Sequence, residues 1–268
     1  MIKIGDRVIT YSSYADGTFF ATLNCSEYPE NEPITWLYDS EAEFLPLYFI
    51  VQHFRDTEGY RRTLNMPYCP EARMDRRERD IDIFTLKYFS QLLNACHFDR
   101  VNIFDPHSDV VTALVNHVHV VSPGPIINQL LEKFPSALIA LPDEGSLQRL
   151  RNVITVPTVF GIKQRNWETQ KVEKLVLGGA KHNVAGHDIL IVDDICGKGS
   201  TIYYMATTLK ELGANNIYVY VSHCENTVLQ PHFTGRSLMD IPGLITELYT
   251  TNSIYRGNHE KIKIIHWF

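Results

Sequence analysis

One segment of the sequence combines acidic, glycine and hydroxyl residues in an order that suits a phosphorylated sugar. Four apolar residues, Ile189–Val192, precede Asp193 and Asp194, and a turn then leads into a predicted helix. The turn contains the remaining candidates, Gly197, Lys198, Gly199, Ser200 and Thr201. Glycines let backbone N–H groups approach a phosphate, hydroxyls donate to it, and a helix N-terminus carries a partial positive charge. The segment is predicted to bind an anion, and an acidic strand end with a flexible turn and helix cap is the alternative.

The acids and the lysine of this segment indicate which ligand it binds and which known loop type it is not. Carboxylates at the edge of a phosphate cradle bind ribose hydroxyls or Mg²⁺. The segment is not a P-loop of the GxxxxGK[ST] type, because Lys198 is followed by Gly199.

The elements around this segment predict an α/β fold with two domains and mainly parallel sheets. Apolar runs predict strands, and apolar positions at helical spacing predict helices between them. The predicted strands are 48–52, 101–104, 137–141, 189–192 and 217–222, and the predicted helices are 81–95, 126–133 and 202–212. Strand–helix alternation gives parallel sheets that bind ligands past the carboxyl ends of their strands. The prolines and glycine of Val121–Pro125 place a domain boundary there, dividing the chain into 1–122 and 123–268.

Composition excludes several classes of protein. The chain has 268 residues, 44% hydrophobic and 21% charged, which excludes wholesale disorder. Its net charge of −6 argues against a nucleic-acid or membrane-surface binder. The sequence has no run long enough for a membrane span and no secretory signal at its start. Five cysteines without a CxxC pair favour reduced thiols, and the expected location is the cytoplasm, the host's if a phage encodes the chain.

Seven segments, in order along the chain, resemble motifs of the ribose-phosphate diphosphokinases (PRPP synthetases), which have the type I phosphoribosyltransferase fold. Tyr14–Gly17 resembles the nucleotide loop, and Met66–Arg76 the region around the "PYARQDK" motif. Asp105–Ser108 stands at the Asp-Leu-His metal motif, and Pro142–Gly145 at the "SPDxGG" loop. The others are Lys163–Arg165 at the catalytic pair, ILIVDDICGKGSTI at the ribose-phosphate loop and Thr250–Ser253 at the "TNT" loop. Simple phosphoribosyltransferases share the ribose-phosphate loop and lack the N-terminal motifs.

The resemblance implies a reaction and a role for each matched residue. Family members transfer the β,γ-diphosphate of ATP to the anomeric hydroxyl of ribose 5-phosphate, giving PRPP and AMP, with Mg²⁺ as cofactor. It assigns catalysis to Lys163 and Arg165, and ATP binding to Asp16, Arg73, Asp75 and His107. Ribose phosphate is assigned to Asp143, Asp193, Asp194, Gly197, Lys198, Gly199, Ser200 and Thr201, and the metal to Asp105, His107 and Asp143. Homo-oligomers, dimers or hexamers, are also implied, with Asp16 serving an adjoining protomer.

Taken without the resemblance, several of these residues have ordinary structural interpretations. The charged run ARMDRRERD is typical of a solvated helix start, and His107 of a capped turn. Alternation places the side chains of Lys163 and Arg165 on one side of an extended segment. The alternative to a catalytic role is that they are strand-end cations paired with Glu168 or Glu173. The loop that follows, 166–174, is predicted to be mobile. His223 is either a weak site candidate or a buried, satisfied histidine.

The sequence also departs from the family pattern. The usual phosphate loop reads close to DDxxDTxGT, and Gly197-Lys198 replaces its internal Asp-Thr, so one acid is lost and one cation gained. Thr18 stands where the nucleotide loop has Glu, and the chain ends at Phe268 without the expected terminal helix and tail.

The changed loop keeps three alternatives open beside PRPP synthesis. In the first alternative, the acceptor is ADP-ribose, as in phage relatives that reconstitute NAD⁺, because Lys198 suits a longer 5′ substituent. Alternatively, the chain is a phosphoribosyltransferase that consumes PRPP, or a non-catalytic regulatory homologue.

Overall fold

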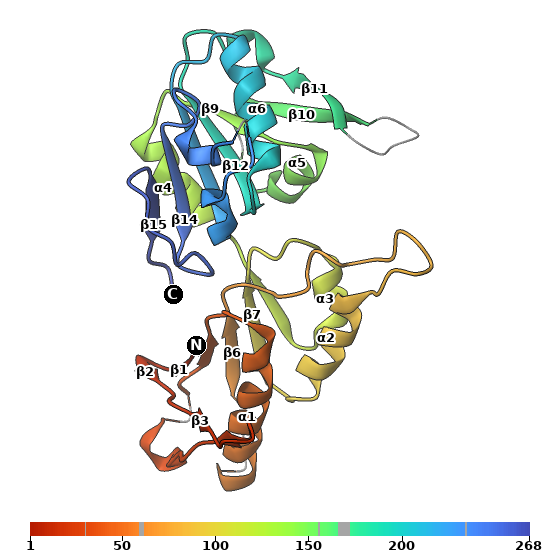
Figure 1. Cartoon of the computed structure of the whole chain (residues 1–268), viewed down its shortest axis with the longest axis vertical. Helices are drawn as coiled ribbons and strands as arrows, with labels where there is room; N and C mark the ends of the chain where they lie inside the picture. The colour runs from red at the N-terminus through yellow and green to blue at the C-terminus, as the bar shows by residue number, and fades with distance from the viewer. Residues whose placement is uncertain (30, 59–61, 155, 166–171, 234) are drawn as a thin grey trace. The chain divides into compact units, whose positions relative to one another are not determined.

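The computed structural model describes residues 1–29, 31–58, 62–154, 156–165, 172–233 and 235–268, and divides into two compact units. Unit 1 is Met1–Ser122 and unit 2 is Pro123–Phe268. Each unit has its own mixed α/β layers around one sheet (Figure 1). The predicted α/β class with mainly parallel sheets is confirmed.

Unit 1 is built on a six-stranded sheet in the order β2-β1-β5-β6-β7-β8. The pairs β2–β1 and β1–β5 are antiparallel, and β5 to β8 run parallel. The strands are β1 Ile2–Ile4, β2 Arg7–Val8, β5 Ile34–Trp36, β6 Thr63–Met66, β7 Arg100–Phe104 and β8 Val118–Val121. A separate hairpin joins β3 Ser12–Ser13 to β4 Phe19–Phe20, and the helices are α1 Phe44–Glu58, α2 Thr85–Asn94 and α3 Val110–Leu114.

Unit 2 is built on a seven-stranded sheet in the order β11-β10-β9-β12-β13-β14-β15. Only the edge pair β10–β11 is antiparallel among the described strands of this sheet. The strands are β9 Leu138–Leu141, β10 Thr158–Arg165, β11 Val172–Gly179, β12 Ile189–Cys196, β13 Ile217–Cys224, β14 Glu247–Thr251 and β15 Ile262–Ile265. The helices are α4 Gly124–Lys133, α5 Glu144–Leu150 and α6 Ser200–Glu211.

The core of unit 2 surrounds β12, the strand that carries Asp193 and Asp194. Seven of the eight residues of β12 are buried, because the strand lies in the middle of the sheet. Four residues of α6 pack on this core with a spacing of three or four: Ile202, Met205, Ala206 and Leu209. A central strand with a helix packed against it gives a fixed platform for the loop that joins them.

Most predicted elements are confirmed, with three corrections. The prediction of a strand over 48–52 is wrong, because these residues lie in α1. Leu47, Ile50, Val51 and Phe54 are buried there at helical spacing, so the apolar run was part of a longer amphipathic pattern.

The other two corrections concern element ends. The helix predicted over 81–95 begins only at Thr85, because the Arg79 side chain and backbone N–H donate to the Asp82 carboxylate in a preceding turn. The loop predicted over 166–174 is shorter than expected: 172–174 pair with β10 as the start of β11, and 166–171 lie outside the described residues. Within the described part of the chain, no helix has the length and apolar character of a membrane span.

Candidate functional site

Two adjacent parallel strands bring the acidic candidates of unit 2 together. β9 and β12 pair with Ile191 opposite Ala140, so their carboxyl ends lie at the same edge of the sheet. Asp143 follows β9 and caps the N-terminus of α5, where its Oδ1 accepts a hydrogen bond from the Ser146 backbone N–H at 2.9 Å. Asp193 and Asp194 lie on β12 itself and are 8% and 6% exposed.

Ser146 joins these two strand ends. Its hydroxyl oxygen lies 3.1 Å from Oδ1 of Asp143 and 3.0 Å from Oδ1 of Asp193. A hydroxyl has one proton, so it donates to one carboxylate, and the second contact requires a proton on a carboxyl group. Ser146 was missed from the sequence, although the Asp-x-x-Ser spacing is a helix N-cap signal.

The electrostatics of this edge agree with a bound proton. Burial, then the negative charges of Asp194 and Asp143, raise the pKa of Asp193 to about 8, and Arg149 partly opposes the shift. Arg149 Nε lies 3.9 Å from Oδ2 of Asp194, with 18% of the arginine side chain exposed. The edge therefore carries more carboxylates than its neighbouring arginine balances, and a cation or hydroxyl donor would be stabilised there.

The loop between β12 and α6 has the geometry of an anion cradle. Gly199 is the N-cap of α6 with φ +82°, and a Cβ at this position would lie 2.5 Å from Cδ2 of Leu238, so only glycine fits. Ser200 Oγ lies 3.3 Å from His232 Nε2, Thr201 lies in the first turn of α6, and Lys198 is exposed. Backbone N–H groups at the start of this 12-residue helix are suited to a phosphate.

His223 is a buried histidine with a partner, as its structural interpretation predicted. It is 2% exposed, and its Nδ1 lies 3.0 Å from the Ser253 hydroxyl. Thr251 donates to the Ser222 carbonyl at 2.7 Å in the same network. The network ties the end of β13 to β14 and to the TNSI segment, so the "TNT"-like residues have a structural role.

In unit 1, the candidates for nucleotide and metal gather at the end of β7. Asp105 is 3% exposed with φ +40°, and its backbone N–H donates to the Val121 carbonyl at 3.0 Å. His107 is exposed two residues further on. The Ser108 hydroxyl donates to Oδ2 of Asp75 at 2.7 Å, which brings the 73–76 segment to this turn. A serine hydrogen bond thus joins motifs that are 33 residues apart.

The remaining unit 1 candidates are exposed. Arg73 and Asp16 are both exposed, and Asp16 lies in the turn of the β3–β4 hairpin. The Thr18 backbone N–H donates to Oδ1 of Asp16 at 2.9 Å, and this bond lowers the pKa of the carboxyl group. Thr18 therefore fixes the aspartate of the loop rather than supplying a second acid.

The predicted catalytic pair lies at the end of β10. The backbones of Lys163 and Arg165 pair with Leu175 and Val172 of β11, and their side chains lie outside the described part of the structure. The pairing shifts register between Gln164 and Arg165, because residue 173 of β11 has no partner on β10.

The carboxylates of Asp105 and Asp143 are chemically suited to bind Mg²⁺. Carboxylate oxygens are hard ligands, and Mg²⁺ commonly binds to one or two of them together with water and substrate phosphates. Among the described residues, no group of three or more His, Cys, Asp or Glu is arranged to hold a metal ion.

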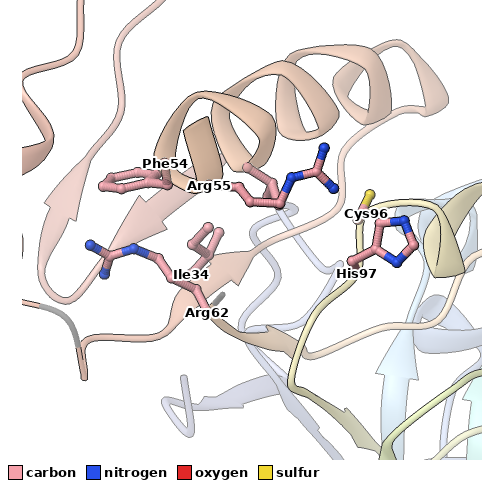
Figure 2. Close-up of a pocket in the computed structure, with 7 residues that line it drawn as sticks. Ile34, Phe54, Arg55, Arg62, Cys96 and His97 are labelled. Carbon is pink, nitrogen blue, oxygen red and sulfur yellow. The ribbon is translucent and has the colours of Figure 1, made fainter. Parts of the chain in front are cut away.

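A hollow in unit 1 lies away from these candidates (Figure 2). Figure 2 shows Arg55 reaching towards Cys96 and His97, while Arg62 runs beside Phe54. The Arg62 guanidinium donates to the carbonyls of Tyr28, Pro29 and Glu32 and lies 4.0 Å from the Phe54 ring centre. These bonds make Arg62 a structural residue, and the hollow is lined mainly by core side chains.

Comparison with known proteins agrees with the fold and with the family resemblance of the sequence. A family model described as a phosphoribosyl transferase domain matches residues 129–234. The ribose-phosphate pyrophosphokinase of Thermococcus kodakarensis is 26% identical over 221 residues, covering 81% of this chain and 75% of the relative. That of Shewanella oneidensis is 26% identical over 264 residues, covering 94% and 79%.

A solved structure supports the same fold across both units. The phosphoribosylpyrophosphate synthetase of Mycobacterium smegmatis has a TM-score of 0.74 and 17% identity, covering 96% of this chain and 85% of that one. The fold of the chain is of the phosphoribosyltransferase type. The chain is similar in sequence to the ribose-phosphate pyrophosphokinases, also called diphosphokinases, and the resemblance of its motifs to that family is confirmed.

Proposed function

We propose that the chain transfers the β,γ-diphosphate of ATP to the anomeric hydroxyl of ribose 5-phosphate, giving PRPP and AMP. The main support is the shared strand edge of unit 2, where Asp143 and a Gly-rich helix start follow two adjacent parallel strands and Asp193 lies on one of them. The relatives named ribose-phosphate pyrophosphokinase support the same activity.

The acceptor would bind to unit 2. Its 5′-phosphate would accept hydrogen bonds from the 197–201 loop, and its sugar hydroxyls would bind the carboxylates of Asp193 and Asp194. The acceptor oxygen then forms a bond to the β-phosphorus of ATP while the bond from that phosphorus to the α–β bridging oxygen breaks, and the hydroxyl proton is released. Such a transfer depends mainly on alignment and on neutralised charge.

The family resemblance supports a role for further residues in binding ATP and in the transfer. Asp16, Arg73, Asp75 and His107 are assigned to the nucleotide. Lys163 and Arg165 would stabilise the charge that spreads over the transferred phosphoryl oxygens. Mg²⁺, when bound with ATP, would supply further charge neutralisation, and Asp105, His107 and Asp143 are the residues proposed to hold it.

An acceptor assay tests this function. The chain is incubated with ATP, Mg²⁺ and either ribose 5-phosphate or ADP-ribose, and AMP is measured by chromatography. We expect AMP with at least one acceptor, and ADP-ribose is included because Lys198 is exposed beside the cradle, where a second phosphate would meet it. Absence of AMP with both acceptors would exclude the proposal.

Controls separate the proposal from its two alternatives. A phosphoribosyltransferase would release diphosphate from PRPP and a nucleobase without ATP. A regulatory homologue would show no activity that depends on Lys163. For Lys163→Ala we expect a fall in kcat of at least about 100-fold, with Lys181→Ala, an exposed lysine of the same unit, as the matched control.

We also propose that the chain acts as a cytoplasmic homo-oligomer, a dimer or hexamer, with no nucleic-acid or membrane partner. Light scattering at several protein concentrations tests the assembly, and a constant monomer mass would contradict it.

A further inference from the structure

Position 197 has no side chain where the related loop motif has an acid, and the neighbouring strand supplies a carboxylate at the same place. A Cβ at Gly197 would lie 3.3 Å from Oε2 of Glu225, and 3.5 Å from its Cδ and Oε1. Glu225 directly follows β13, which pairs in parallel with β12. The acid that is missing from the loop sequence is thus replaced in space by one that is 28 residues later in the chain.

The carboxylate of Glu225 is held in this position from two directions. Its backbone N–H donates to the Cys196 carbonyl at 2.8 Å, which fixes the residue beside the loop. The Thr227 hydroxyl donates to Oε2 at 2.8 Å, which fixes the side chain. The Cys196–Cys224 pair lies in register on β12 and β13, so the backbone anchor lies at the end of the sheet, and Thr227 follows in the 3-10 helix Asn226–Leu229.

Steric and electrostatic effects make the two acid positions alternatives. Gly197 does not have a positive φ, so an aspartate there would cause no backbone strain of the left-handed kind. Its carboxylate would, however, extend into the space of the Glu225 carboxylate, and two like charges at contact distance disfavour each other. The loop can therefore hold an acid at 197 or at 225, but not both without rearrangement.

We infer that Glu225 is a positioning residue of the acceptor loop, taking over the acidic role that the related motif gives to position 197. This inference rests on the proposed function, because it assumes that the loop binds the phosphorylated sugar. Glu225 sets the shape and charge of the loop next to Lys198, and so influences which acceptor binds there.

Four variants test this inference by reciprocal rescue. Gly197→Asp and Glu225→Ala each alter the loop, and the double variant Gly197→Asp/Glu225→Ala moves the acid from 225 to 197. We expect each single variant to raise both KM and Kd for ribose 5-phosphate by about tenfold while kcat changes by less than about threefold, with the double variant within about threefold of the parent. Glu211→Ala, an exposed glutamate at the far end of α6, is the matched control and should equal the parent.

The readouts are chosen so that folding and function are tested separately. Circular dichroism checks that each variant folds, and Glu225→Gln replaces the alanine variant if that one does not. Calorimetry of ribose 5-phosphate and ADP-ribose without ATP measures acceptor binding whether or not transfer occurs. If the parent binds an acceptor but releases no AMP, the proposed function fails while the binding comparison still tests Glu225. The inference would be overturned if the effects of the two substitutions simply add in the double variant. It would also be overturned if both single variants bind the acceptor as the parent does, or if the parent binds no acceptor.

Discussion

In unit 2, the acidic candidates Asp193 and Asp194 are 8% and 6% exposed and lie on a buried central strand. In unit 1, Asp16, Arg73 and His107 are exposed on turns and loops. The unit 2 geometry is present without a ligand, because strand pairing and a helix cap fix it. An exposed side chain loses side-chain entropy when a ligand orders it, and this cost applies to the unit 1 candidates. Substitutions should therefore affect folding in unit 2 and mainly binding in unit 1.

Glycine substitutions should give the largest contrast between the units. Gly199 and Gly17 have φ of +82° and +85°, but a Cβ would contact Leu238 at 2.5 Å in the first case and nothing within 4 Å in the second. Gly199→Ala should lower the free energy of unfolding by about 3 kcal/mol, from backbone strain and overpacking. Gly17→Ala should cost about 1 kcal/mol, from strain alone. Urea unfolding measures both, and equal losses would contradict the contrast.

The pH dependence of stability should also come from unit 2. In the folded chain Asp193 keeps its proton up to about pH 8, whereas an unfolded aspartate loses it near pH 4. Between these values the folded state binds more protons, so the stability of the ligand-free protein should fall as the pH rises, by up to about 1 kcal/mol per pH unit.

Asp193→Asn should flatten this slope in urea unfolding between pH 5 and pH 8. Asp188→Asn is the control and should leave the slope unchanged, because Asp188 precedes the first residue of β12, at the other end of the strand. An unchanged slope in the Asp193 variant would show that the proton resides elsewhere.

Two serines that connect loops offer a closer comparison. Ser146 contacts two carboxylates in unit 2, and Ser108 contacts the single carboxylate of Asp75 in unit 1. Ser146→Ala should destabilise the chain by about 2 kcal/mol, because it removes the hydroxyl that contacts both the half-buried Asp143 and the buried Asp193, and Ser108→Ala by about 1 kcal/mol. Thermal unfolding provides the measurement, and the opposite order would argue against a preformed site in unit 2.

The reactivity of the cysteine thiols should differ least between the two units. All five are free thiols and buried, and burial raises the pKa of Cys69 and of Cys96 to about 12. A hydrogen bond that the Cys196 thiol donates to Cys224, together with burial, also raises the pKa of Cys196. Thiol-reactive dye should therefore label fewer than one thiol per native chain at pH 7.5 and all five in denaturant. Rapid labelling of the native chain would show that one unit opens readily.

Much of the fold could be predicted from the sequence, because buried parallel strands are continuous apolar runs. β7, β9, β12 and β13 were found in this way, and the run at 48–52 was misassigned because a short apolar run does not distinguish a strand from a buried helix face. The loop after β12 was recognisable because its glycines, acids and hydroxyls are adjacent in sequence.

The missed residues of the candidate site act across strands. Ser146 is 47 residues from Asp193, and Glu225 is 28 residues from Gly197. Their roles depend on the order of β9, β12 and β13 in the sheet, which local patterns do not encode. The resemblance to the family motif indicates a lost acid in the loop, and the register of two strands places Glu225 beside that position.

The position of β9 has a consequence for how unit 2 forms. β9 pairs with β12, whose residues come about 50 positions later, so the central pair closes a long stretch of chain. Non-local parallel pairing of this kind slows folding, because loop-closure entropy is lost before the contacts form. The edge that carries Asp143 and Asp193 is therefore absent from early intermediates. The recovery of acceptor binding during refolding would time the completion of this sheet, and a pause there would expose strand edges to aggregation.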